Sequence, residues 1–522
     1  MRGAAVMLAW LPLAFSGAAA EAYMMVVPDD NDGVVCQGSV CIATARMACI
    51  SADKLEQMLA QGDVTLVPGA VAKDIVVTAP VRWESGHRLI FDSFHSVSIR
   101  RPIMISGGGG LTITTNDGGK NGKFAIINQG RIGFTKKNSG LTINGSAYKL
   151  VGSVKELAFQ VQEQPDGHFA LTSDFDAQSD PHKAPAISTV FSGTFDGLGH
   201  TISNLAFSHA TEVYDGEHSY WAAGLFASIA RTGVVRDLAL NNVSAAVSHA
   251  GAEIGSVAGH NEGLIRYVTA SGTITGKGSA VGGIAGYSSG ILYAVTSGVR
   301  IDATRSRWAG GMVGNNRGVI ERSLAAGDVT GGRYSGGLAG FSNTTLISYA
   351  TGSVTGGTDD AIIGGLIGQS REIVESYATG TVTGNAVGVT AGGLAGDAAQ
   401  VKNSYATGRV EVGPTGIAGG LVGDLPRGKI VESYSIGSVS GGSGSILGSF
   451  IGHDLGGTSD GYWNSDVGDQ GCGNGSCSGV IGLSTAAFQA ALPSGFAPRV
   501  WGLDTDHNGG YPHLLAPLKH FP

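Results

Sequence analysis

The sequence predicts an all-β fold, a right-handed parallel β-helix (β-solenoid) with short capping helices. Three observations predict it. A glycine-rich motif recurs nine times, each repeat contains short β-prone segments between glycine turns, and no repeat carries a ten-residue helical pattern. Such a repeat forms one coil, which buries its apolar residues only by stacking on neighbouring coils.

The repeat is clearest in residues 336–357, GGLAGFSNTTLISYATGSVTGG, and returns with small changes from Gly364, Gly392 and Gly419. The second small residue of its G-G-L-x-G element recurs at intervals of 26 to 32 residues, at Gly224, Ser256, Gly283, Gly311, Gly337, Gly365, Gly393, Gly420 and Ser449. Parallel coils stack about 4.8 Å apart. We therefore expect glycine where the chain turns sharply or where the backbones of successive coils approach closely.

The chain is expected to have four structural regions after its leader. Residues 221–452 hold the nine repeats, and residues 61–210 alternate in the same β manner without a strict repeat, so they predict irregular coils. Residues 21–60 form an N-terminal cap in which Ser51 begins a helix over residues 52–61, with Leu55, Met58 and Leu59 on one face. Residues 453–522 form a C-terminal cap with a second short helix over residues 484–492.

Residues 1–20 are typical of a secretory signal peptide. Arg2 precedes an apolar run, and Ala18 to Ala20 offer a cleavage site after Ala20, so we expect an exported chain that is secreted or displayed on the cell surface. No later segment has the roughly 18 apolar residues that a membrane span needs, so no membrane insertion is expected. A net charge of -8 without a basic block gives no electrostatic basis for nucleic-acid binding.

The five cysteines lie in two groups. In an oxidising compartment Cys472 and Cys477 are expected to form a disulfide, and one pair is expected among Cys36, Cys41 and Cys49, with the pairing left open. A zinc site at these cysteines is the weaker alternative, because no further ligand follows at the required spacing. We expect no metal and no cofactor.

The motif G-G-L-x-G…S-Y-A-T-G-x-V-x-G resembles the GLUG repeat of bacterial surface proteins of the filamentous haemagglutinin type, which also flanks some IgA-cleaving proteases. The segment FSGTFDGLGHTISNL resembles the sequence that commonly precedes those repeats, and YWNSDVGDQ and GGYPHLL resemble their usual ending. The resemblance implies a secreted or surface-displayed β-helix that is often associated with adhesion. The H-E-x-x-H of the protease relatives is absent, so the resemblance does not extend to peptidase activity.

Most residues with catalytic potential favour a structural interpretation. Ser288 lies in a G-x-S-x-G match, but inside a repeat and without a following helix. The histidines at 200, 218, 260 and 453 have no partner at ligand spacing. The acids of the repeats are scattered, although Glu375 and Glu432 share the position before Ser-Tyr, which Asn403 takes between them. The acids at 174, 176, 180 and 196 are the better place for an enzyme or a cation.

One tyrosine per coil recurs before Ala-Thr-Gly or its variant, at Tyr349, Tyr377, Tyr405 and Tyr434. In register, the rings would stack about 4.8 Å apart. Strict alternation points Ala350 and Val354 inward and leaves the tyrosines outward. An exposed column would suit sugar rings or a protein partner, whereas a buried one would be core, and the sequence leaves both open.

These observations favour a non-catalytic adhesion or interaction protein that binds a glycan or protein partner along a repeat face. The alternative is a polysaccharide-acting enzyme, a lyase or glycosidase, on the same scaffold. That alternative requires acids gathered at one place along the coils.

Overall fold

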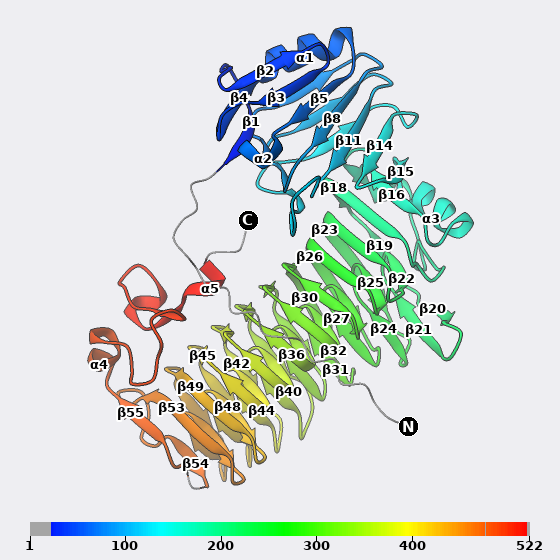
Figure 1. Cartoon of the computed structure of the whole chain (residues 1–522). Coiled ribbons are helices and arrows are strands. Elements are labelled where there is room, and N and C mark those ends of the chain that lie inside the picture. The colour runs from blue at the N-terminus through cyan, green and yellow to red at the C-terminus, as the bar shows by residue number, and fades with distance from the viewer. Residues whose placement is uncertain (1–21, 476, 519–522) are drawn as a thin grey trace, which may run out of the picture. The chain divides into compact units, whose positions relative to one another are not determined.

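The computed structural model describes residues 22–475 and 477–518, and it consists mainly of short parallel strands stacked in coils (Figure 1). The predicted β-solenoid is confirmed. The predicted signal peptide at residues 1–20 lies outside the described residues. The chain divides into two compact units, one formed by residues up to 131 with 138–147, the other by 132–137 and everything from 148 onward. None of the described helices has the length and hydropathy of a membrane span.

The first unit is a solenoid whose strands pair in parallel across successive coils. One sheet contains β4 Met47–Ser51, β1 Tyr23–Val27, β6 Asp74–Val77, β9 Val97–Ile99 and β12 Phe124–Ile126. A second contains β3 Val40–Ala43, β5 Val64–Val67, β8 Arg88–Asp92, β11 Gly110–Thr114 and β14 Gly140–Ile143, and a third side contains β7 Val81–Trp83 and β10 Ile103–Ile105. An antiparallel strand, β2 Val34–Gln37, pairs with β3.

The predicted N-terminal helix is present as α1, Ala52–Gln61. The hydroxyl of Ser51 accepts a hydrogen bond from the backbone nitrogen of Lys54 at 3.2 Å, which satisfies one free donor of the first turn. Leu55 and Leu59 are fully buried, so the apolar stripe read from the sequence faces the core. A four-residue helix, α2 Gly69–Ala72, follows β5.

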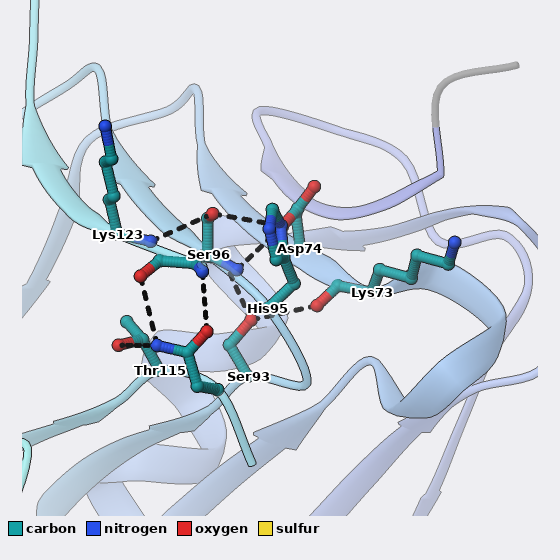
Figure 2. A network of polar contacts seen from close by, with 9 residues as sticks. Lys73, Asp74, Ser93, His95, Ser96, Thr115 and Lys123 are labelled. Carbon is teal, nitrogen blue, oxygen red and sulfur yellow. Dashed lines mark hydrogen bonds and ion pairs between the residues drawn. The ribbon is translucent and has the colours of Figure 1, made fainter. Parts of the chain in front are cut away.

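Polar side chains link the coils of this unit at one corner (Figure 2). Asp74 Oδ1 accepts from the backbone nitrogen of Ser96 at 2.7 Å, and it lies 2.7 Å from His95 Nδ1. The hydroxyl of Ser96 in turn accepts from the backbone nitrogen of Lys123 in the next coil at 3.1 Å. The network satisfies corner backbone groups that no strand ladder reaches, so we assign it a structural role.

The second unit contains, near its start, an element that the sequence analysis missed. Residues 154–163 form a helix, α3 Val154–Glu163, inside the region predicted as irregular coils only. Ser153 caps it by accepting from the backbone nitrogen of Glu156 at 3.1 Å, and Leu157 and Val161 face the core. The helix leads to β16 His168–Leu171 and the long strands β18 Thr194–Ser203, β23 Val234–Val247 and β26 Leu264–Gly276.

Each later repeat forms one coil of four strands. The first strand precedes the G-G-L element: β35 Tyr334–Gly336, β39 Ile362–Gly364, β43 Thr390–Gly392 and β47 Ile417–Gly419. The second follows it: β36 Ala339–Leu346, β40 Ile367–Val374, β44 Ala395–Lys402 and β48 Val422–Leu425. The third contains the tyrosine: β37 Tyr349–Ala350, β41 Tyr377–Ala378, β45 Tyr405–Ala406 and β49 Lys429–Ser435. The fourth closes the coil: β38 Val354–Gly356, β42 Val382–Gly384, β46 Val410–Val412 and β50 Val439–Gly441.

Repeat positions pair with one another from coil to coil, as Gly364 with Gly392 and Tyr377 with Tyr405. The glycines of the motif permit this close stacking. A Cβ atom on Gly365 would overlap the carbonyl oxygen of Gly393 in the next coil, so any larger residue would push the coils apart.

The C-terminal segment, red in Figure 1, follows the last coils, β53 Thr458–Asn464, β54 Cys472–Asn474 and β55 Val480–Leu483. The predicted second helix is present as α4, Thr485–Ala490, two residues shorter at its C-terminal end, with Ser484 as its cap. A short antiparallel pair follows, β56 Trp501–Gly502 with β57 His513–Leu514, and then α5 Leu515–Leu518.

Candidate functional site

A sharp backbone corner positions each tyrosine. The residue two places before it lies in the left-handed region, with φ of 50° at Ile347, 49° at Glu375, 48° at Asn403 and 50° at Glu432. Left-handed backbone is costly for residues other than glycine, so the surrounding coil must enforce it. Glu375 and Glu432 thus lie at a backbone corner that Ile347 and Asn403 form equally in the other coils, so the corner does not require an acid.

A buried serine follows the left-handed residue in each of these four coils. The backbone nitrogen of Ser376 donates to the hydroxyl of Ser404 at 3.2 Å, and the hydroxyl of Ser376 donates to the carbonyl oxygen of Val374 at 2.8 Å. The same bonds recur from Ser348 to Ser433. This serine ladder fixes the chain direction so that the next side chain, the tyrosine, points out of the coil.

The tyrosine rings form a stacked column on the outer face of the solenoid. Ring centroids are 4.6 Å apart from Tyr349 to Tyr377, 4.7 Å from Tyr377 to Tyr405 and 5.1 Å from Tyr405 to Tyr434, with interplanar angles of 6° to 8°. Tyr462 of β53 is the register partner of Tyr434 in the next coil. The spacing matches the strand separation of a parallel sheet, so the column is a direct product of coil register.

Much of the column is covered. Tyr349 and Tyr377 are half-buried, whereas Tyr405 is 4% exposed and Tyr434 is fully buried. The cover is the C-terminal segment. Its Trp501 lies 6.0 Å from the ring of Tyr405 and 5.8 Å from that of Tyr434 between centroids. The column is thus buried at the Tyr434 end and half-buried at the Tyr349 end.

Aromatic and polar contacts hold the cover in place. Phe488 and Phe496 pack on Tyr434 with centroid separations of 5.4 and 6.2 Å. The hydroxyl of Tyr434 donates to the carbonyl oxygen of Pro512, and it accepts from Asn508 Nδ2 at 2.6 Å. The buried hydroxyl is therefore satisfied at both its donor and its acceptor sites.

The column is uncharged at physiological pH. Burial raises the pKa of Tyr377, and the neighbouring Tyr349 raises it further. Burial also raises the pKa values of Tyr405 and Tyr434 well above the usual tyrosine range. The rings therefore offer flat neutral surfaces and no phenolate nucleophile.

A second constellation lies on the strand that follows the G-G-L element. Asp397 and Asp424 hold the same position in successive coils and are register partners, with Gln369 before them and His453 after them. The prediction that the acids are scattered along the repeats is wrong at this position. It could have been found in the sequence, because G-G-L-A-G-D and G-G-L-V-G-D align directly.

The two carboxyl groups have distinct polar neighbours. Gln369 Nε2 donates to Asp397 Oδ2 at 3.1 Å, while His453 Nδ1 lies 3.7 Å from Asp424 Oδ1. Burial raises the pKa of Asp397, the hydrogen bond from Gln369 partly offsets this rise, and the adjacent Asp424 raises the pKa further. Burial likewise raises the pKa of Asp424, which His453 partly offsets. Half-buried carboxyls with raised pKa values are suited to proton transfer.

The acids predicted before the repeats do not form one site. Asp176 accepts from Asn204 Nδ2 at 2.9 Å, and Asp180 accepts from the backbone nitrogen of Lys155 at 2.7 Å. Asp196 lies inside the solenoid, where its carboxylate is 2.7 Å from the guanidinium of Arg236. These separate structural contacts do not create a shared cation or catalytic centre.

The other predicted positions are also accounted for. Ser288 is fully buried and its hydroxyl accepts from Asn261 Nδ2 at 3.0 Å, so it is not an exposed nucleophile. His200 contacts the carboxylate of Asp174 at 3.2 Å, and His260 contacts that of Glu253 at 2.7 Å. The remaining candidate histidines are His218, in the turn before β21 Ser219–Ala223, and His453, beside Asp424.

The cysteines are arranged in two short-range disulfides. Cys472 bonds to Cys477, and Cys36 bonds to Cys41 across the antiparallel pair of β2 and β3. Cys49 is a half-buried free thiol, and burial raises its pKa. The pairing among the first three cysteines, which spacing left open, is thus Cys36 with Cys41.

Comparisons with known proteins give limited matches. No family model matches the chain. Over 121 residues the chain is 36% identical to "Halomucin" of Haloquadratum walsbyi, a stretch that covers 21% of this chain and 1% of the relative. The chain thus spans about one hundredth of the length of the curated relative it matches.

Among solved structures, a "putative immunoglobulin A1 protease" from Bacteroides ovatus matches with 17% sequence identity and a TM-score of 0.30. The match covers 71% of this chain and 92% of that one.

Proposed function

We propose that the protein is an exported, surface-displayed or secreted interaction protein without catalysis, which binds a glycan or protein partner at the open end of the tyrosine column. The observation that carries the proposal is the half-buried pair Tyr349 and Tyr377, stacked 4.6 Å apart with nearly parallel rings. Tyrosine is a favoured binding residue because it offers a large, rigid apolar face with a polar edge.

The preceding coil extends this surface. Leu324 is the register partner of Tyr349 and is also half-buried, so an apolar strip continues from Tyr349 into the preceding coil. Sugar rings and extended peptides both match a flat strip of repeated, neutral contacts. Tyr405 and Tyr434 belong to the covered part and are not assigned to the binding face.

The test is a binding screen of the exported chain on immobilised glycans and on candidate surface proteins. The double variant Tyr349→Ala, Tyr377→Ala should lose binding by about 10-fold or more, since each interface aromatic contributes on the order of 1–2 kcal/mol. Tyr334→Ala is the matched control, because Tyr334 is a half-buried aromatic on a different sheet. Unchanged binding by a folded double variant would refute the proposed face.

A polysaccharide-acting enzyme is the second candidate, and the register pair Asp397 and Asp424 is the observation that favours it. Retaining glycosidases place two carboxyl groups about 5 Å apart, one with a raised pKa as the general acid. The test is release of reducing ends or unsaturated products from a panel of polysaccharides. This candidate would be established if the chain showed such activity and Asp397→Asn and Asp424→Asn each abolished it. Asp302→Asn, at an exposed position, should retain the activity.

A further inference from the structure

Three side chains of the C-terminal segment lie close together, and none of them belongs to the tyrosine column or to the acid pair. His507 Nδ1 lies 2.8 Å from Asp504 Oδ1, and His513 Nε2 lies 3.6 Å from Asp504 Oδ2. One ligand atom from each residue falls within 4.8 Å of the other two. The imidazole centroids are 4.7 Å apart.

Local backbone structure presents two of these side chains. Asp504 Oδ1 accepts from the backbone nitrogens of Asp506 and His507, each at 3.0 Å. This turn directs the ring of His507 back onto the carboxylate and leaves Asp504 Oδ2 facing His513.

A strand pair presents the third side chain. His513 in β57 is the register partner of Gly502 in β56, and a Cβ atom at Gly502 would lie 2.5 Å from His513 Nε2. Glycine at this position therefore makes room for the imidazole. His513 is only 4% exposed, and within the described part of the chain its Nδ1 has no hydrogen-bond partner. Because Nε2 is the nitrogen that faces the Asp504 carboxylate, it is the one that a metal would bind, and Nδ1 would remain on the other side of the ring.

The chemistry of the three donors selects the kind of ligand. Two imidazoles and one carboxylate are the ligands that zinc and similar divalent transition metals prefer, whereas calcium and magnesium favour oxygen donors alone. We propose that Asp504, His507 and His513 bind one divalent metal ion of the zinc class, with a water molecule completing the coordination.

The metal would fasten the cover of the tyrosine column. Asn508 and Pro512, which lie between the two histidine ligands in the chain, are the residues that contact the hydroxyl of Tyr434. A metal that joins His507 to His513 closes the loop that holds Tyr434 and, through β56, Trp501. The role of the metal is structural, because a metal that binds the folded chain in preference to the unfolded chain stabilises the folded state. The site is independent of which partner binds at Tyr349 and Tyr377.

The chain contains a natural control with the same local turn. Asp215 Oδ1 accepts from the backbone nitrogens of Glu217 and His218, each at 2.8 Å, in the same Asp-x-x-His spacing. No third ligand accompanies Asp215 and His218 in the described residues. His218→Ala should therefore leave metal binding unchanged.

The experiment uses the full exported chain, stripped with a chelator and titrated with Co²⁺ by absorbance, then with Zn²⁺ in competition. One equivalent of metal per chain is expected. His507→Ala and Asp504→Asn should each lower the affinity by at least about 100-fold, since loss of even an outer-shell partner costs about 10- to 100-fold. Zn²⁺ should raise the Tm of the unaltered chain and of His218→Ala but not that of His507→Ala.

His507 is the decisive position because its side chain is 44% exposed, so His507→Ala removes a ligand without disturbing buried packing. His513→Ala would remove a ligand and disrupt buried packing together. Circular dichroism establishes that each variant is folded. Stoichiometric binding that His507→Ala and Asp504→Asn retain would overturn the proposal. So would the failure of the folded, unaltered chain to bind Co²⁺ or Zn²⁺ at micromolar concentration.

Discussion

The indole nitrogen of Trp501 donates a hydrogen bond to the side-chain oxygen of Asn403 at 3.4 Å, although 98 residues separate the two in sequence. Asn403 occupies the left-handed corner of its coil, where the neighbouring coils have Glu375 and Glu432. The bond therefore joins the C-terminal segment to a specific coil, and both its partners are buried.

Replacement of Trp501 tests this attachment. Trp501→Ala should lower the free energy of unfolding of the segment by about 3–5 kcal/mol, because a fully buried indole is removed. Limited proteolysis should then release the segment after β55 first. Trp221→Ala is the matched control, since Trp221 is 37% exposed, and it should cost less than about 1 kcal/mol. Equal resistance of the two variants would contradict the role assigned to Trp501.

The corner residue Ile347 provides a test of backbone strain. It has φ of 50°, which a β-branched residue adopts at a cost of roughly 1–2 kcal/mol. Ile347→Asn should therefore raise the midpoint of urea unfolding, because asparagine tolerates this conformation. Leu346→Asn, on the adjacent half-buried strand residue without positive φ, should lower it. A lower midpoint for both would show that side-chain burial outweighs strain at this corner.

The buried acid Asp237 inside the solenoid predicts that the stability of the chain depends on pH. Burial, followed by the nearby Asp196, raises the pKa of Asp237 to about 8, above the ordinary value of 3.8. Between these values the folded state binds more protons than the unfolded state, so stability falls as pH rises from about 4 to about 8. Urea unfolding at successive pH values should show this decline in the unaltered chain. Asp237→Asn should flatten it, and an identical slope in the variant would rule Asp237 out as its source.

Coil stacking can be tested at a single glycine. Gly365→Ala should destabilise the second unit by about 1–3 kcal/mol, because the added methyl group would overlap the carbonyl oxygen of Gly393 and separate the coils. Gly298→Ala is the control, since the nearest atom to its added Cβ would be 3.7 Å away. The comparison uses the urea midpoint of each variant, and equal midpoints would contradict the close-approach argument.

Local repetition made most of the fold predictable. The recurrence of G-G-L-x-G set the coil length, and alternation around Ala350 and Val354 correctly placed both inside. Helix α1 could be read from Ser51 and its apolar stripe. Helix α3 carries the same signals at Ser153, Leu157 and Val161, but its position within a β-prone region concealed them.

The site was less predictable, because its features depend on distant contacts. The column of tyrosines follows from coil register, yet its cover depends on Trp501 docking onto Asn403, which no periodicity indicates. The triad at Asp504, His507 and His513 likewise requires β56 and β57 to pair before the two histidines meet. The tyrosine register and the alignment of Asp397 with Asp424 were present in the sequence pattern itself.

The serine ladder has a consequence for how such a chain changes length. The bonds of each serine lie within its own coil or reach the coil beside it, so these hydrogen bonds impose no fixed number of coils. The indole of Trp501 in the C-terminal cover, in contrast, contacts the rings of Tyr405 and Tyr434. Duplication of a whole coil upstream of residue 336 would thus lengthen the solenoid and leave the covered end of the tyrosine column unchanged.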